Sequence, residues 1–211
     1  MLKETEPQWV IWGRRLAAVA QNGLTYAENH YDLERYMQVR EVAAEMMAAG
    51  FQAPAARIQA LLAGENGYAT PKVDTRGVVF REGKLLLVRE LADGGRWTLP
   101  GGWADVNDTP SAAVEREIFE EAGFITRAEK LLAVYDRSKH GHEPPYPFHI
   151  YKLFFRCTIL GGEATTSVET GEVAFFGPDE IPELSSSRVT AGQIARCFAH
   201  LHQPDWPTDF D

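Results

Sequence analysis

The sequence predicts an α/β protein, an α/β/α sandwich preceded by a small all-helical N-terminal domain. Two changes of pattern along the chain lead to this prediction. Apolar residues recur at helical spacing up to about residue 65, whereas short β-branched and aromatic runs separated by Gly-rich turns follow from Lys72 onward. Strands, a helix, more strands and a last helix fit a layered sheet covered by helices. We therefore expect domains at 1–65 and 73–211, joined by a linker at 66–72.

Three helices are expected in the N-terminal domain. Trp9 and Trp12 begin the apolar stripe of the first helix. Asp32 is placed to cap the second helix, which ends at Gly50, and Pro54 opens a short third one. A domain of this size buries few side chains by itself, and its apolar residues are too many to hide. We therefore expect a homodimer in which this domain contributes to the subunit interface.

The second domain is expected to alternate strands with two helices. The helices are predicted from Pro110 to Gly123 and from about Thr190 to His202, and a polar, proline-rich loop is predicted at 136–147. The predicted strands are 73–80, 84–90, 130–135, 149–159 and 172–176, and a short strand that runs into a Gly-Gly turn is predicted at 97–102.

The first helix of this domain carries a cluster of acidic side chains. Glu117, Glu120 and Glu121 lie on one face of the helix, and Arg116 lies beside them. Because like charges repel, this spacing favours a shared cation, and oxygen ligands suit Mg²⁺ or Mn²⁺ rather than zinc. The Gly101–Gly102 turn before the helix lets the backbone approach a ligand closely.

The other positions of this helix are suited to packing and capping. Ile118, Phe119 and Ala122 are predicted to face a core. Either Asp108 or Thr109 is placed as the N-cap.

These residues resemble the Nudix box, G-x5-E-x7-R-E-U-x-E-E-x-G-U, in which U is a bulky aliphatic residue. Two positions depart from it, because Asp108 stands where the box has its first Glu and Phe124 fills the last apolar position. The resemblance covers nearly the whole chain, since one bacterial Nudix subgroup carries a similar helical N-terminal domain. It implies the Nudix α/β/α sandwich. The matching positions are Gly102, Arg116, Glu117, Ile118, Glu120, Glu121 and Gly123.

The resemblance implies a metal-dependent enzyme in which Glu117, Glu120 and Glu121 are metal ligands. A backbone carbonyl of the Gly101–Gly102 turn is a further candidate ligand, and Arg116 is implied to hold the glutamates in place. Nudix enzymes take the general base from the box helix or from a distant loop. The candidates here are Glu117, which we favour, Glu169 and Glu172.

The implied reaction is attack of water on the pyrophosphate of a nucleoside diphosphate linked to another moiety, X. The products are a nucleoside monophosphate and phospho-X. The subgroup suggests ADP-ribose or CDP-choline, and we favour CDP-choline because aromatic faces recognise a quaternary ammonium group. The aromatic candidates are Trp103, Tyr135, Tyr146 and Phe148. The candidate substrate-binding residues are Arg76, Arg89, Trp103, Arg137, Lys139 and His140, with the N-terminal domain supporting the site.

The loop at 136–147 also has an alternative interpretation as a metal site. His140 and His142, together with His149, have the side chains that zinc binds, but no Cys accompanies them. A loop that contacts substrate is the favoured interpretation.

Composition and charge narrow the classes of function. The net charge of −9, from 30 acidic and 21 basic residues, argues against binding to nucleic acid or to an anionic membrane. A nucleotide-sensing Nudix-like regulator and an inactive scaffold remain as alternatives, although the box keeps its charges.

Cys157 and Cys197 lack metal or redox spacing. With no apolar leader or membrane-spanning run, a cytoplasmic location is expected.

Overall fold

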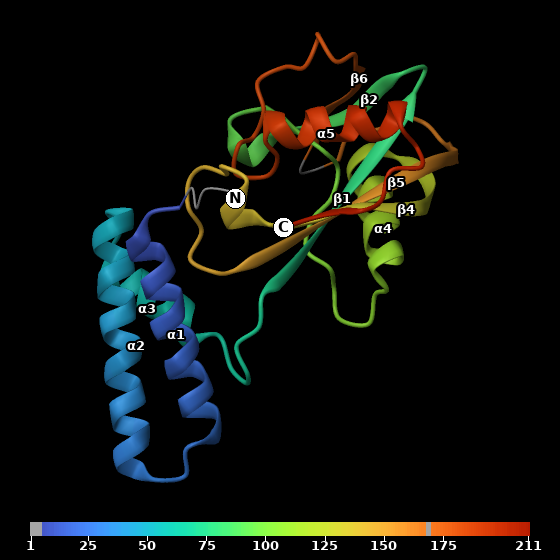
Figure 1. The fold of residues 1–211 in the computed structure, drawn as a ribbon. Coiled ribbons are helices and arrows are strands. Elements are labelled where there is room, and N and C mark those ends of the chain that lie inside the picture. Colours follow the sequence, from blue (N-terminus) through green and yellow to red (C-terminus); the bar gives the residue numbers. More distant parts are fainter. Residues whose placement is uncertain (1–5, 168–169) are drawn as a thin grey trace. The chain divides into compact units, whose positions relative to one another are not determined.

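The computed structural model describes residues 6–167 and 170–211, which form two compact units (Figure 1). The first unit ends at Pro71 and also contains Pro145–His149. The second unit contains the described residues of Lys72–Pro144 and Ile150–Asp211. The sequence did not predict that a piece of the polar loop belongs with the N-terminal helices.

The first unit consists of three helices, as predicted, but the start of the second helix differs. Asn29 rather than Asp32 caps the second helix, and its side chain accepts a hydrogen bond from the Tyr31 N–H. Pro54 precedes the third helix as expected. The helices are α1 (Gln8–Tyr26), α2 (His30–Phe51) and α3 (Ala55–Ala63).

Gly50, which was predicted to end the second helix, lies inside α2, and Gly23 lies inside α1. A Cβ on Gly50 would meet the ring of Trp9, and a Cβ on Gly23 would meet the ring of Tyr36. The absence of a side chain therefore lets an aromatic ring of the neighbouring helix pack directly against the helix backbone. The cost of glycine within a helix is offset by this close packing.

The core of the first unit also includes the loop segment. Phe148 packs against the buried residues of α2 and α3, and the Tyr146 carbonyl accepts a hydrogen bond from Arg14 Nε at 3.0 Å. The segment predicted as a linker is hydrogen-bonded to α1, because the Ala69 N–H donates to Asn22 Oδ1 at 2.7 Å. The buried residues are Ala43, Ala44, Met47, Ala48, Ile58 and Leu62.

The described strands of the second unit form a mixed sheet in the order β3-β2-β1-β5-β4-β7, with β6 paired to β2. Strand β1 is parallel to β5 and antiparallel to β2. The strands are β1 (Lys72–Arg81), β2 (Lys84–Glu90), β3 (Arg96–Thr98), β4 (Phe124–Asp136), β5 (Ile150–Gly162), β6 (Thr170–Phe176) and β7 (Asp209–Phe210). The helices are α4 (Pro110–Ala122) and α5 (Ala191–His202), with 3-10 turns η1 (Leu91–Asp93) and η2 (Arg137–Lys139).

Helices α4 and α5 cover opposite faces of this sheet (Figure 1). Successive strand residues point to opposite faces, so Val78 joins the core against α5 and Val79 joins the core against α4. Leu85 and Leu86 on β2 divide in the same way. The predicted α/β/α sandwich is therefore confirmed.

Three details of the second unit differ from the predictions. Phe119 is 55% exposed, although Ile118 and Ala122 on the same helix are buried as expected. Strand β4 begins at Phe124, directly after the helix, rather than at Lys130. The sequence did not predict β7, because two residues are too short for a periodic pattern.

Candidate active site

The glycine turn before α4 lies alongside β1. The Thr75 N–H donates to the Gly102 carbonyl at 2.7 Å, and the Gly77 N–H donates to the Pro100 carbonyl at 2.8 Å. Gly101 has a φ of +139°, and a Cβ there would meet the Thr75 carbonyl. Glycine is therefore required for this backbone path.

Helix α4 has the ends that its sequence predicts. Thr109 is the N-cap, and its side chain accepts a hydrogen bond from the Ala112 N–H at 3.2 Å. Pro110 lies in the first turn, and Gly123 ends the helix with a left-handed φ of +77°. These local features set where the acidic face of the helix begins and ends.

Arg116 is the centre of an ion-pair cluster on α4. Its Nη1 donates to Glu117 Oε1 at 2.8 Å and to Glu120 Oε2 at 3.0 Å, the i,i+4 contact expected from the spacing. Its Nε donates to Asp108 Oδ2 at 3.1 Å. Burial alone would lower the pKa of Arg116, but these three acids raise it above its usual value. The shorter side chain at Asp108 therefore still reaches the cluster.

Glu121 points into the protein and is 7% exposed. Its Oε2 accepts a hydrogen bond from the Gly101 N–H at 2.8 Å. Burial raises the pKa of Glu121 to about 7, although Arg76 and the Gly101 N–H oppose the shift. Burial also raises the pKa of Glu117, and its hydrogen bond with Arg116 opposes that shift.

The acidic side chains offer only oxygen atoms as metal ligands, and oxygen ligands fit a hard divalent cation. The carboxylate of Glu117 lies against the Gly102 backbone, where a Cβ would be 2.8 Å from Oε2, so no side chain separates the two. Over residues 6–167 and 170–211, no three His, Cys, Asp or Glu side chains converge in a metal-binding arrangement. Instead, Arg116 joins Glu117 to Glu120, and Gly101 holds Glu121.

Arg76 lies beneath this region rather than on its surface, with 4% of its area exposed. Its Nη2 and Nε donate to Asp74 at 2.6 and 2.8 Å, and its Nη1 donates to the Leu99 carbonyl at 3.2 Å. Burial by itself would lower the pKa of Arg76. The negative charges of Asp74, Glu121 and Glu117 oppose this effect and raise the pKa above its usual value. Arg76 therefore acts electrostatically on the acidic face from within the protein.

Arg89 and Glu172 lie on neighbouring strands and form an ion pair. Arg89 Nη1 is 3.6 Å from Glu172 Oε2, and both side chains are about half exposed. Arg89 Nε also donates to the Gly95 carbonyl at 3.0 Å. Glu169, the other loop candidate for a general base, lies outside the described residues.

The predicted substrate loop divides between the two units. Arg137 is buried in the second unit, where its Nη2 donates to the Pro144 carbonyl at 2.8 Å. Lys139 ends the short η2 turn, and His140 follows it. By contrast, Tyr146 and Phe148 belong to the helical unit. The loop predicted at 136–147 is therefore not one structural piece, because its end belongs with the helices.

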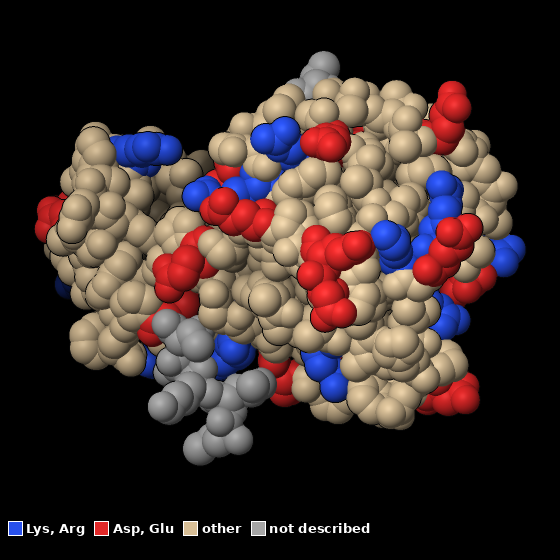
Figure 2. Space-filling model, turned by 90° about the horizontal axis from the view of Figure 1, so that it is seen from above, with Lys and Arg blue, Asp and Glu red and all other residues tan. Residues whose placement is uncertain are grey.

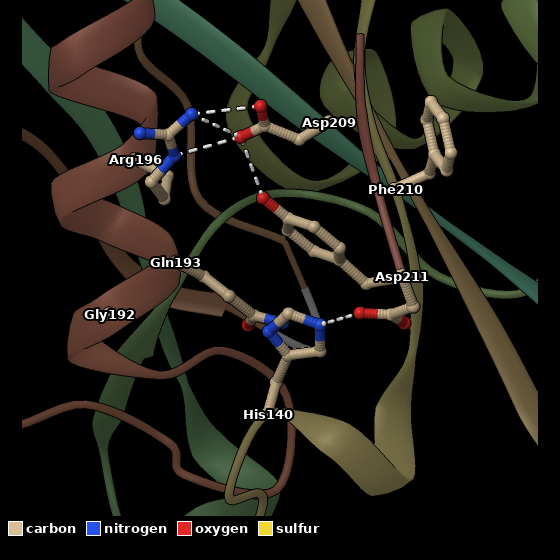
Figure 3. Close-up of a pocket in the computed structure, with 8 residues that line it drawn as sticks. His140, Gly192, Gln193, Arg196, Asp209, Phe210 and Asp211 are labelled. Carbon is tan, nitrogen blue, oxygen red and sulfur yellow. Dashed lines mark hydrogen bonds and ion pairs between the residues drawn. The ribbon is translucent and has the colours of Figure 1, made fainter. Parts of the chain in front are cut away.

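His140 lines an open pocket of about 340 Å³ in the second unit (Figure 3). Its Nε2 lies 2.8 Å from Asp211 Oδ1, and its ring packs against that of Tyr135 with a centroid separation of 4.0 Å and a tilt of 35°. Asp209 accepts hydrogen bonds from Tyr135 Oη and from Arg196 in the same pocket. This pocket lies against α5, whereas the acidic cluster is on α4, which covers the other face of the sheet.

The aromatic candidates differ in accessibility. Trp103 is 43% exposed, whereas Tyr135 is 6% exposed. Phe148 packs in the core of the helical unit. Fewer aromatic faces are therefore accessible than the sequence suggested.

The zinc interpretation of the histidines is wrong for the part of the chain that the structure describes. His142 is buried, and its Nδ1 donates to the Ser186 carbonyl at 3.0 Å while its Nε2 accepts from Gln193 Nε2 at 3.1 Å. His140 contacts Asp211 instead. The described histidines therefore do not form a shared metal site.

Sequence reasoning missed several buried polar residues near the acidic face. Asp74 and Lys152 lie opposite each other on β1 and β5, and Lys152 Nζ donates to Asp74 Oδ1 at 2.6 Å. Glu90 is buried on β2 and pairs with Arg188 at 3.2 Å. A charged residue inside an otherwise apolar strand was the available signal, but a single strand does not reveal its partner.

The surface agrees with the mixed composition of the chain. On the face seen in Figure 2, described Lys and Arg side chains lie among Asp and Glu rather than in one continuous basic stripe. None of the helices in the described ranges combines the length and hydrophobicity needed to cross a lipid bilayer.

Two family models match the chain. One, described as the NUDIX domain, matches residues 71–196. The other, described as a UDP-X-like N-terminal oligomerisation domain, matches residues 7–62. The first match lies mostly in the second structural unit, and the other lies in the helical unit.

Two of the similar proteins match this chain over nearly its full length. A Bacillus subtilis (strain 168) protein named "Putative ADP-ribose pyrophosphatase" is 43% identical over 208 residues, which cover 99% of each chain. A UDP-X diphosphatase structure is 31% identical, with a TM-score of 0.62, and covers 97% of this chain and 98% of that one. An ADP-ribose pyrophosphatase structure from Streptococcus suis is 39% identical, with a TM-score of 0.61, and covers 67% of this chain and 100% of that one.

One conclusion follows from the acidic helix with its arginine, the glycine turn packed on β1, and these matches. The chain belongs to the Nudix family and is a Nudix hydrolase with a UDP-X-like N-terminal domain.

Proposed function

We propose that this protein hydrolyses the pyrophosphate bond of a nucleoside diphosphate linked to another moiety X. The observation that carries the proposal is the cluster in which Arg116 holds Asp108, Glu117 and Glu120 beside the Gly101–Gly102 turn. An array of carboxylates attracts an anionic diphosphate only when cations accompany it. The cluster is thus suited to binding a metal-complexed nucleotide.

Nudix hydrolases generally use divalent metal ions, and we propose Mg²⁺ or Mn²⁺ for this protein. Glu117, Glu120 and Glu121 would hold the ion, with a carbonyl of the Gly101–Gly102 turn as a further ligand. When bound, the ion neutralises phosphate charge and lowers the pKa of water. Arg116 orients the glutamates by the ion pairs described above.

We propose Glu117 rather than Glu172 as the general base. Glu117 lies in the acidic cluster, directly against the Gly102 backbone. Glu172 is instead paired with Arg89 on exposed strand surface. Glu117 is therefore the acid that is better placed to take a proton from attacking water.

ADP-ribose is the first substrate to test. Two of the similar proteins are named for ADP-ribose, and one of them matches this chain over 99% of its length. The case for CDP-choline relied on aromatic side chains, of which Tyr135 and Phe148 are occupied in packing. CDP-choline remains the second candidate because Trp103, which follows the glycine turn in the chain, is 43% exposed.

The test is a comparison of kcat/KM for ADP-ribose, CDP-choline and a UDP-sugar under identical pH and metal concentration. Phosphorus NMR identifies the products, and EDTA added in excess tests the metal requirement. The proposal expects a nucleoside monophosphate, and no turnover with EDTA. A tenfold preference corresponds to about 1.4 kcal/mol in transition-state binding and decides between the substrates. Absence of turnover for all three overturns the proposal.

We further propose a homodimer that forms through the helical unit. The matching model for residues 7–62 is described as an oligomerisation domain. Large apolar side chains on its helices are exposed, including Trp12, Val19, Tyr26, Tyr31 and Val42.

We also propose a cytoplasmic location for this protein. Its two cysteines, Cys157 and Cys197, are free and buried, which fits a reducing compartment.

A further inference from the structure

Three charged side chains meet inside the second unit, shielded from solvent. Asp74 Oδ1 accepts hydrogen bonds from Lys152 Nζ at 2.6 Å and Arg76 Nε at 2.8 Å, and Asp74 Oδ2 accepts one from Arg76 Nη2 at 2.6 Å. Each of these residues is at most 4% exposed. We call these three residues the buried triad.

With Lys152 protonated, the buried triad contains two cations and one anion, so its net charge is +1. Arg76 alone already pairs with Asp74 through two hydrogen bonds. Lys152 is therefore not needed to satisfy Asp74, and its burial is unfavourable: desolvation lowers the pKa of Lys152 to about 7, against the effect of Asp74. An apolar side chain of similar size would fill the same space at a smaller desolvation cost. What Lys152 adds is charge.

The positive charge of the buried triad lies close to the acidic face of α4. Arg76 Nη1 donates to the Leu99 carbonyl, two residues before Gly101, whose N–H donates to Glu121. The charges of Glu121 and Glu117 act on Arg76. Because the interior screens charges less than water does, the net charge of the triad acts on whatever binds at this face.

We propose that Lys152 is a positioning residue for the anionic diphosphate. By sharing the Asp74 carboxylate, Lys152 leaves the positive charge of Arg76 uncompensated, and this charge favours binding of the diphosphate beside the acidic cluster. The inference rests on the proposed function. A protein of net charge −9 with a carboxylate cluster repels an anionic substrate, and the charge of the triad adds to that of a bound cation in offsetting this repulsion.

The test changes the charge of the triad while keeping its shape. Lys152→Met reduces the net charge from +1 to zero, and the double variant Asp74→Asn/Lys152→Met returns it to +1 through Arg76 alone. The probe is α,β-methylene ADP, a non-hydrolysable diphosphate, whose Kd is measured by calorimetry at saturating Mg²⁺. We expect Lys152→Met to weaken binding about tenfold and the double variant to recover most of the loss.

Kinetics and stability distinguish this role from a structural one. Lys152→Met should raise KM by a similar factor with a smaller change in kcat, and its thermal stability should equal or exceed that of the wild type. Lys152→Gln provides a second neutral variant if the methionine variant does not fold. Unchanged probe affinity in the neutral variant, or a double variant that binds no better than Lys152→Met, overturns the inference.

A failure of the proposed function would look different. In that case the wild-type protein would neither bind the probe nor hydrolyse nucleoside diphosphate derivatives. Wild-type binding and turnover with no effect of Lys152 would leave the proposed function intact and remove only this inference.

Discussion

The carboxylate of Glu117 fills the space that a side chain on Gly102 would need. A Cβ on Gly102 would lie 2.8 Å from Glu117 Oε2 and 3.1 Å from its Cδ. Because the obstacle is the end of a flexible side chain, Gly102→Ala should displace the carboxylate and leave the fold intact. We expect kcat to fall by about 10²-fold, since a small misplacement of a reacting group costs that much.

The matched control is Gly161→Ala. No atom lies within 4 Å of a Cβ at Gly161. Activity and thermal unfolding of this variant should equal those of the wild type. A Gly102→Ala enzyme with wild-type kcat would show that the position of Glu117 does not matter for turnover.

Glu120→Gln tests the role of charge on α4. The substitution keeps the shape of the side chain, and Glu120 is exposed, so unfolding should be nearly unchanged. We expect kcat to fall by at least about 10²-fold, as expected when a metal ligand that stabilises transition-state charge is lost. Measurement over a range of Mg²⁺ concentrations checks this. Activity within a few-fold of wild type at saturating Mg²⁺ would rule out the ligand assignment.

Glu117→Gln and Glu172→Gln separate the two candidates for the general base. A general base contributes about 10²–10⁴-fold to the rate. We expect Glu117→Gln to lose activity on this scale and Glu172→Gln to remain within a few-fold of wild type. The ion pair between Arg89 and Glu172 is exposed, so its loss should affect stability by at most about 1 kcal/mol. The reverse pattern of activity would assign the base to β6.

His142 should make the protein sensitive to acid. Burial lowers the pKa of His142 to about 3, and its two hydrogen bonds fit the neutral ring. The unfolded chain, with a His pKa near 6.5, therefore binds the extra proton first as the pH falls. Stability from this group is fully present above pH ~6.5 and is lost on acidification toward pH ~3, by about 2 kcal/mol at pH ~5.

Denaturant unfolding between pH 5 and 8 measures this effect. His142→Asn removes the titrating ring, so the variant should show a shallower fall in stability with acidification than the wild type. Equal slopes for the two proteins would mean that His142 does not contribute to the acid sensitivity.

Light scattering at working concentration tests the proposed dimer. Trp12 is 51% exposed on α1, so Trp12→Glu should weaken the dimer by introducing a charge into an apolar contact. The control is Leu91→Glu, which introduces the same charge at a similarly exposed apolar position in the other unit and should leave the dimer intact. A wild-type chain that scatters as a monomer contradicts the proposal.

The sequence by itself determined the helix that carries the acidic face. Pro110 in its first turn, its left-handed end at Gly123 and the contact of Arg116 with Glu120 all depend on residues a few positions apart. Helix geometry fixes such neighbours whatever the rest of the protein does. The same locality explains why the order of most strands and helices was predictable.

Only the tertiary structure decided which distant residues surround that helix. Asp74 and Lys152 become partners because β1 and β5 lie side by side, although 78 positions separate them in the chain. The segment 145–149 joins the helical unit because Phe148 completes a core formed by residues far from it in sequence. Strand pairing and burial depend on contacts across the whole chain, so a local pattern shows a charged residue in a strand but does not reveal its partner.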